Sequence, residues 1–298
     1  MAKFHILPTQ EQASWYAFSE ILLPKWEEIT GLGLATGSTP LLLYGWMIWY
    51  FKLGKLSFAN IKCVNLDEYV GLLPGHPQSY WTWMWDNLFK YVDVKSENWI
   101  VPFGGTTNPS QLEEICLQME KRIEDIKGVT WWILGMGKNA HVAFIEPPAD
   151  PDGRYSVVEL SRSTIEANSR FFKDIEEVPT RAISAGIKTI MEAKHLLQLA
   201  FGSEKAWAVA ASVLGPKSVW VPSSLLQDHP DWHLVVDEEA GAGILKHLAE
   251  RKIRPKEEGV YVVVSDAGIT HQVTLPRSLA SKYGILQKTS REEEEDLR

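Results

Sequence analysis

Two short segments of this sequence bring together side chains that could exchange protons. Asp67 and Glu68 are adjacent carboxylates after an apolar run, and such a pair is costly to bury unless it is paired or used. His141 and Glu146 follow a glycine-rich turn and lie within one loop, so they could form an acid–base pair. Either pair alone is more often an ordinary structural feature, so its chemistry depends on the elements that position it.

A third segment has the composition of a turn that binds an anion. The apolar run Gly31–Ala35 predicts a buried strand, Gly37 allows a tight turn, and Ser38 and Thr39 add hydroxyls. Pro40 is then expected at the first position of a helix, whose free N–H groups and dipole favour a negative ligand. We therefore predict a phosphate site at this turn, although a simple helix cap would give the same pattern.

Two cations farther along the chain could complete that site. Arg170 lies in the segment Asn168–Phe172, and Lys205 follows the turn Gly202-Ser203. Guanidinium and ammonium groups bind phosphate strongly when they converge. An isolated surface cation is the alternative for each.

Strand-like and helix-like segments alternate along most of the chain, which predicts an α/β fold, Rossmann-like, with a mostly parallel sheet flanked by helices. The predicted strands are Gly31–Ala35, Ile61–Leu66, Val129–Leu134, His195–Phe201 and Trp232–Val236. The predicted helices are Pro40–Leu53, Pro77–Tyr91, Ser110–Ile126 and one from Glu204. Ligands bind beyond the carboxyl ends of such strands, so the polar clusters above should meet at one rim.

Residues 1–253 are predicted to form the main domain and residues 254–298 a small extension. Val260–Val264 and Gln272–Leu275 predict a β-hairpin, Ser278–Tyr283 a short helix, and Arg291–Arg298 an acidic, disordered end. The hairpin and helix weakly resemble swapped-hairpin DNA-binding regulators, but the acidic end opposes DNA. We expect the extension to serve packing or oligomerisation.

Composition and net charge limit the kinds of molecule that this protein is expected to bind. The 298 residues carry a formal net charge of −8, which makes nucleic acid an improbable partner. We find no apolar stretch typical of a membrane span or a leader, and we expect Cys63 and Cys116 to be reduced thiols in a cytoplasmic protein. Neither a metal ion nor another cofactor is expected, and a homo-oligomer is left open.

Taken together, these segments resemble glucosamine-6-phosphate deaminases, relatives of 6-phosphogluconolactonases and ribose-5-phosphate isomerases. The similarity runs from about residue 30 to about residue 240. It rests on segments in the order and spacing of that family: residues 36–40, Asn65–Gly71, His76–Tyr80, Gly135–Pro147, Asn168–Phe172 and Gly202–Lys205.

The resemblance implies the conversion of glucosamine 6-phosphate into fructose 6-phosphate and ammonia without a cofactor. Asp67 would move a proton from carbon 2 to carbon 1 through an enolamine, and His141 would open the sugar ring with Glu146 orienting or charging it. The phosphate would be held by Gly37, Ser38, Thr39, Arg170 and Lys205. Glu68, Tyr80 and Gly137 are expected to complete the pocket.

The sequence departs from the family pattern beside the histidine. Asn139 and Ala140 stand where the family usually has Asp and Gly. An amide cannot stabilise an imidazolium by charge, so we expect a lower pKa for His141 and a less strictly fixed tautomer, with Asn139→Asp raising turnover. Ala140 would be strained if its φ is positive. The stretch after Pro147 also lacks the hydroxyl and basic residues of regulated family members.

These departures leave three hypotheses open. The first is an active amino-sugar-phosphate deaminase, with activity in doubt because of Asn139. The second is an isomerase or lactonase on another sugar phosphate. The third is a non-catalytic sugar-phosphate-binding protein. Asp67, His141 and Glu146 favour an enzyme.

Overall fold

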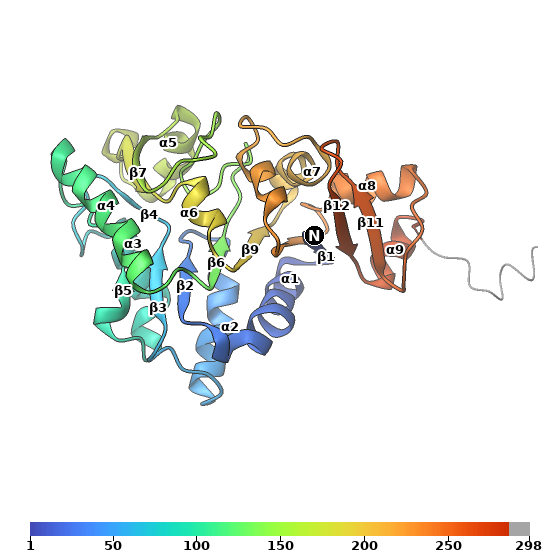
Figure 1. Ribbon diagram of the computed structural model, residues 1–298, viewed down its shortest axis with the longest axis horizontal. Helices are drawn as coiled ribbons and strands as arrows, with labels where there is room; N and C mark the ends of the chain where they lie inside the picture. Colours follow the sequence, from blue (N-terminus) through green and yellow to red (C-terminus); the bar gives the residue numbers. More distant parts are fainter. Residues whose placement is uncertain (286–298) are drawn as a thin grey trace, which may run out of the picture.

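The computed structural model, which describes residues 1–285, is an α/β structure built on one nine-stranded sheet (Figure 1). Every neighbouring pair of strands is parallel except the antiparallel pair β11–β12. The strands, in spatial order, are β11 (Val260–Val264), β12 (Thr270–Thr274), β1 (Lys3–Leu7), β10 (Trp232–Asp237), β9 (His195–Ala200), β6 (Trp131–Leu134), β2 (Gly31–Leu34), β3 (Lys62–Asn65) and β5 (Trp99–Ile100).

A second, three-stranded antiparallel sheet consists of β4 (Asp67–Tyr69), β8 (Arg181–Ser184) and β7 (Ser156–Glu159). It follows directly on the large sheet, because β4 begins two residues after β3 ends. The α-helices are α1 (Gln10–Tyr16), α2 (Leu41–Lys52), α3 (Tyr80–Asn87), α4 (Pro109–Asp125), α5 (Arg162–Asn168), α6 (Ile187–Met191), α7 (Ala206–Leu214), α8 (Ala242–Glu250) and α9 (Arg277–Lys282).

Helices cover both faces of the large sheet, and β6 shows why both faces are apolar. Successive side chains of a strand point to opposite faces. Trp131 and Ile133 therefore pack in a cluster with α1, α2 and α3, whereas Trp132 and Leu134 pack in another with α4, α7 and α8. A parallel sheet buried on both sides explains the continuous apolar runs of its strands.

The predicted fold class is confirmed, and several predicted boundaries are corrected. Pro40 immediately precedes α2 instead of opening it. β3 ends at Asn65, and Asp67 opens β4. The predicted helix over residues 77–91 is limited to α3, and the one predicted from Glu204 begins as a 3-10 turn, η7 (Ser203–Lys205), before α7. The strands β1, β4, β5, β7 and β8 were not predicted from the sequence.

The C-terminal extension is joined to the main sheet. β12 pairs in parallel with β1, and β11 forms the outer edge (Figure 1). Tyr261, Val273 and Leu279 belong to the same buried cluster as Phe4 and Trp232. The hairpin and short helix are therefore present where the sequence predicts them, and they pack on the sheet. The predicted acidic, disordered end at Arg291–Arg298 lies outside the described residues.

No helix within residues 1–285 has the length and apolar character needed to cross a membrane.

The close packing at the centre of the sheet can be tested by a substitution at Gly33 in β2. A Cβ there would lie 1.7 Å from Cε3 of Trp132, a fully buried side chain on the neighbouring strand. We expect Gly33→Ala to lower the free energy of unfolding by about 1–3 kcal/mol, because the indole must move within a close-packed core.

The control for this variant is Gly45→Ala in α2, where a Cβ meets nothing within 4 Å. That change should raise the free energy of unfolding by up to about 1 kcal/mol, since alanine favours helices. Denaturant unfolding of the two variants measures both effects. A Gly33→Ala protein as stable as the parent would contradict the packing described here.

Candidate active site

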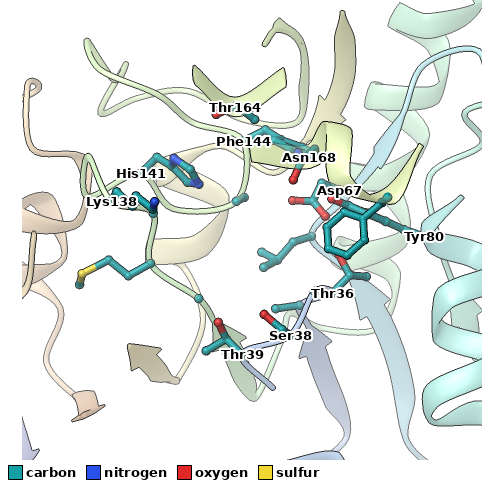
Figure 2. A pocket seen from close by; sticks show the side chains of 18 of the residues that line it. Thr36, Ser38, Thr39, Asp67, Tyr80, Lys138, His141, Phe144, Thr164 and Asn168 are labelled. Carbon is teal, nitrogen blue, oxygen red and sulfur yellow. The ribbon is translucent and has the colours of Figure 1, made fainter. Parts of the chain in front are cut away.

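One cavity of about 980 Å³ opens where β2, β3, β6 and β9 end. It gathers every site residue predicted from the sequence except Glu68 and Glu146. Figure 2 shows Ser38 and Thr39 at one end of it, with Asp67 and His141 on two other sides. The residues that line it include Gly37, Ser38, Thr39, Asp67, Tyr80, Gly137, Asn139, His141, Arg170 and Lys205.

The end of the cavity beside α2 is suited to an anion. Gly37 has a φ of +85°, a conformation that glycine adopts without strain. The turn it allows sets Ser38 and Thr39 directly before Pro40 and the start of α2. Free N–H groups and the positive end of the helix dipole therefore face the same region as two hydroxyls.

Three cations line the same cavity. Arg170 comes from the turn after α5, and its guanidinium lies 4.6 Å from the ring centre of Phe171. Burial lowers the pKa of Lys205, with further lowering from Lys138 and Arg170. Lys138, which the sequence analysis did not single out, is paired with Glu204 at 2.6 Å. Its position in a glycine-rich loop was the available signal.

Asp67 is a buried ionisable side chain whose carboxylate has no hydrogen-bond donor among the described residues. Only 7% of it is exposed, and no protein group among the described residues donates a hydrogen bond to its carboxylate. Burial, reinforced by the neighbouring Glu68, raises the pKa of Asp67 to about 8. A carboxylate that is costly to ionise takes up a proton readily, so Asp67 is a stronger base than an ordinary aspartate.

Glu68 does not line the cavity, which corrects its predicted place in the pocket. Its Oε1 accepts hydrogen bonds from the backbone N–H groups of Tyr69 and Tyr80, and its Oε2 accepts one from Trp81. Tyr80 and Trp81 open α3, so Glu68 satisfies N–H groups that a helix start leaves free. Alternation along β4 sends this side chain away from Asp67. Glu68 is therefore a structural anchor.

Tyr80, held by that anchor, forms a wall of the cavity near Asp67 (Figure 2). Its ring stacks on Phe144 with centres 5.9 Å apart and lies 5.0 Å from the ring of Tyr69. Burial raises the pKa of Tyr80 well above its usual value, so its hydroxyl stays neutral.

His141, Asn139 and Glu146 form a line of hydrogen bonds. His141 Nδ1 lies 2.8 Å from Asn139 Oδ1, and Asn139 Nδ2 donates to Glu146 Oε2 at 2.9 Å. Because the Glu146 carboxylate accepts only, it turns the amide so that Oδ1 faces the imidazole. The imidazole must then donate from Nδ1, which leaves a lone pair on Nε2. This arrangement favours one tautomer, and the expectation of a less strictly fixed tautomer stays a prediction.

The pKa values of the two titrating groups in this line are both lowered. Burial lowers the pKa of His141, Glu146 opposes that effect and Lys205 adds to it. Burial alone would raise the pKa of Glu146, but hydrogen bonds from Thr164 and Ser161 outweigh it, and the pKa is lowered. Near neutral pH the line therefore joins a neutral imidazole to a charged carboxylate.

The loop that carries this line is tightly constrained. Ala140 has a φ of +63°, which meets the condition for the strain predicted at this position. At Gly137 a Cβ would lie 2.2 Å from His141 Nδ1. Glycine is therefore needed at 137 for the imidazole to occupy its observed place.

A search of residues 1–285 gives no group of three or more His, Cys, Asp or Glu side chains placed to hold a metal ion.

Known proteins resemble this chain over most of its length. Residues 25–234 match the model of the family of glucosamine-6-phosphate isomerases and 6-phosphogluconolactonases. The glucosamine-6-phosphate deaminase of Thermoanaerobacter pseudethanolicus is 44% identical over 213 residues, which is 72% of this chain and 83% of that protein.

Solved structures extend the comparison. A structure described as a monomeric glucosamine-6-phosphate deaminase superposes with a TM-score of 0.77 at 36% identity, over 82% of this chain and 100% of the other. A 6-phosphogluconolactonase from Leishmania guyanensis has a TM-score of 0.63 at 21% identity over 82% and 99%, a likeness that shows the fold alone. On the family model and the 44% identity, the chain belongs to the glucosamine-6-phosphate isomerase/6-phosphogluconolactonase family.

Proposed function

We propose that this protein is an enzyme that converts glucosamine 6-phosphate into fructose 6-phosphate and ammonia without a cofactor. The relatives at 36–44% identity carry the name of that deaminase. The observation that carries the proposal is Asp67, a nearly buried carboxylate that lines the cavity and accepts no hydrogen bond from residues 1–285. Such a group costs stability when it ionises, and a strongly shifted carboxylate that lines a cavity favours a role in chemistry on a ligand.

Binding would begin with the phosphate. The turn at Gly37, Ser38 and Thr39 offers hydroxyls and a helix start, and Arg170 and Lys205 offer positive charge at the same cavity. Fixing this end of the sugar would place carbons 1 and 2 toward the carboxylate and the imidazole, the two groups on the other walls (Figure 2).

Ring opening is assigned to His141. Its neutral form, with Nδ1–H held by Asn139, presents the Nε2 lone pair. Nε2 would take the proton of the hydroxyl on carbon 1 and then return it to the ring oxygen, so the imidazole ends neutral. Asn139 and Glu146 would keep the ring in the required orientation.

Isomerisation is assigned to Asp67. The ionised carboxylate would take the proton from carbon 2 of the open aldose, which gives an enolamine, and return it to carbon 1, which gives an imine. Water then adds to the imine, and ammonia leaves as the ketose forms. One proton moves from carbon 2 to carbon 1, the carbon-1 oxygen gains a proton as the nitrogen loses one, and Asp67 is restored, so no oxidant or reductant is needed.

Asp67 also distinguishes the deaminase from the two other candidate functions, a lactonase and a sugar-phosphate-binding protein. Hydrolysis of a sugar lactone requires no removal of a carbon-bound proton, so a lactonase would have no use for a strong base beside carbon 2. A sugar-phosphate-binding protein would need the cations and hydroxyls and would gain nothing from a buried, unsupported Asp67. We infer a cytoplasmic enzyme, and assembly into oligomers stays a prediction.

The first test compares turnover with binding. The parent protein should release ammonia and form ketose from glucosamine 6-phosphate, and Asp67→Asn should reduce kcat by about 10³-fold or more, since the substituted amide cannot accept the proton. Glucose 6-phosphate should still raise the melting temperature of both proteins. A parent that binds hexose 6-phosphates without ammonia release would favour the binding protein, and a variant within a few-fold of the parent would remove Asp67 from the mechanism.

The second test is the pH dependence of stability. The pKa of Asp67 rises from 3.8 to about 8 on folding, so its stabilising contribution is full below about pH 4 and is lost as the pH rises through 8. Asp67→Asn should therefore melt higher than the parent at pH 8.5, by on the order of 5 °C, and equally near pH 4.

Glu68→Gln is the matched control for this test, because it removes the adjacent charge. Its amide would turn an N–H group toward a backbone donor that the carboxylate now satisfies, so we expect a lower melting temperature at both pH values. Equal effects of the two variants would show that Asp67 is not the strained group.

The third test concerns Asn139→Asp, for which we propose an effect opposite to the one expected from the sequence alone. A carboxylate at 139 would face Glu146 across the 2.9 Å contact now made by the amide, and two such groups cannot both ionise cheaply. Turnover and melting temperature should fall, most above pH 7 and least near pH 5. Adding Glu146→Gln should recover stability at high pH by restoring a donor–acceptor pair. A higher turnover for Asn139→Asp alone would contradict this view.

A further inference from the structure

The carboxylate of Glu146 is held by two hydroxyls that the sequence analysis did not connect with it. Ser161 Oγ donates to Oε1 at 2.8 Å, and Thr164 Oγ1 donates to the same oxygen. The remaining oxygen, Oε2, accepts from Asn139 Nδ2. Both hydroxyls lie 15 to 18 residues beyond Glu146 along the chain, at the start of α5.

α5 also leads to a cation that lines the cavity. Ser161 is the N-cap of this helix, and its side chain accepts from Thr164 N. Asn168, the last residue of α5, lines the cavity, and Arg170 lies in the turn that follows. One short segment therefore contacts Glu146 at its start and carries Arg170, a proposed phosphate ligand, just after its end; Figure 2 shows Thr164 and Asn168 on the cavity wall, with Asn168 beside Asp67.

We propose that Ser161 and Thr164 are positioning residues that fix the tautomer and orientation of His141 through Glu146 and Asn139. The segment that carries Arg170, a proposed phosphate ligand, would thereby also orient the imidazole. This inference rests on the proposed function. Neither residue is assigned a contact with the reacting atoms. Their action passes through a carboxylate and an amide whose orientation follows from the donors around them.

The physical argument depends on which way Asn139 faces. With its charge stabilised at Oε1 by hydroxyls, Glu146 stays ionised and demands the N–H end of the amide. Without them, Glu146 takes up a proton at higher pH and can donate to Asn139 Oδ1 instead. The amide can then turn its N–H group toward His141 Nδ1, which forces the proton of a neutral imidazole onto Nε2. That tautomer has no lone pair to offer a sugar hydroxyl.

The charged groups that bear on Glu146 and His141 come from two elements. They are the two residues themselves in the loop after β6, and Lys205 on η7, which lowers the pKa of His141. Arg162, the charged residue of the first turn of α5, pairs with Glu166 at 2.9 Å and is 93% exposed. Arg162 is therefore a surface residue. The contacts between the start of α5 and Glu146 come from the hydroxyls of Ser161 and Thr164.

Thr164→Val is the informative variant, because valine keeps the shape and removes the hydroxyl. Ser161→Ala would also remove the cap of α5. Thr189→Val is the matched control, since Thr189 is equally buried and its hydroxyl donates to a carboxylate outside the line, that of Glu120. Thr164→Ser keeps the hydroxyl and should behave as the parent does.

The measurement is ¹⁵N NMR of histidine-labelled full-length protein from pH 5 to 8, with the His141 signals identified by their loss in His141→Gln. The parent, Thr164→Ser and Thr189→Val should show Nδ1–H as the neutral tautomer. Thr164→Val should show a substantial Nε2–H population that grows toward low pH. A parent tautomer unchanged in Thr164→Val, or changed equally in Thr189→Val, would overturn the proposal.

Kinetics provide the second measurement. Thr164→Val should lower kcat for ammonia release by about tenfold or more with KM nearly unchanged, and should move the acid limb of the kcat profile to higher pH. Thr189→Val should lower the melting temperature without moving that limb. If the parent itself releases no ammonia, the proposed function fails, while the NMR result still decides the role of Ser161 and Thr164.

Discussion

Hydrogen-bond donors are distributed unevenly among three carboxylates at this site, and the chemistry of the cavity depends on that distribution. Glu68 accepts three backbone N–H groups, and Glu146 accepts two hydroxyls and an amide. Asp67, beside Glu68 in the sequence, accepts none from the described protein. Donors stabilise the ionised form. They lower the pKa of Glu146, burial outweighs them at Glu68 and raises its pKa to about 7, and burial without donors raises the pKa of Asp67 to about 8.

The large parallel sheet makes this distribution possible. Strands that run the same way end at one edge, and the loops after β2, β3, β6 and β9 bring residues far apart in sequence to one cavity. The three-stranded sheet then adds a wall, because Asp67 lies in its strand β4. Close packing fixes these loops: Gly33 admits Trp132 between strands, and Gly137 admits the imidazole of His141.

The sequence was sufficient to predict most of the main sheet, though not β1 or β5, and the main polar residues lining the cavity, since glycine turns and polar residues after apolar runs are local signals. It was insufficient where the cause is not local. β7 and β8 are short strands that depend on pairing with each other and with β4. The side of β4 on which Glu68 lies depends on that pairing too, so its role was misjudged. The amide orientation at Asn139 depends on Glu146, and the Glu146 carboxylate in turn depends on hydrogen bonds from Ser161 and Thr164. Only the capping pattern at Ser161 could have pointed to that helix start.

The most direct test of the central claim uses glucosamine 6-phosphate that carries deuterium on carbon 2. If Asp67 moves a proton between carbons 2 and 1, ammonia release must be accompanied by complete loss of deuterium from carbon 2. NMR of the fructose 6-phosphate should then find part of the label on carbon 1, with the remainder exchanged into water from the carboxyl group. The account would be contradicted if ammonia is released while the sugar product keeps its deuterium on carbon 2. It would also be contradicted if the protein releases no ammonia.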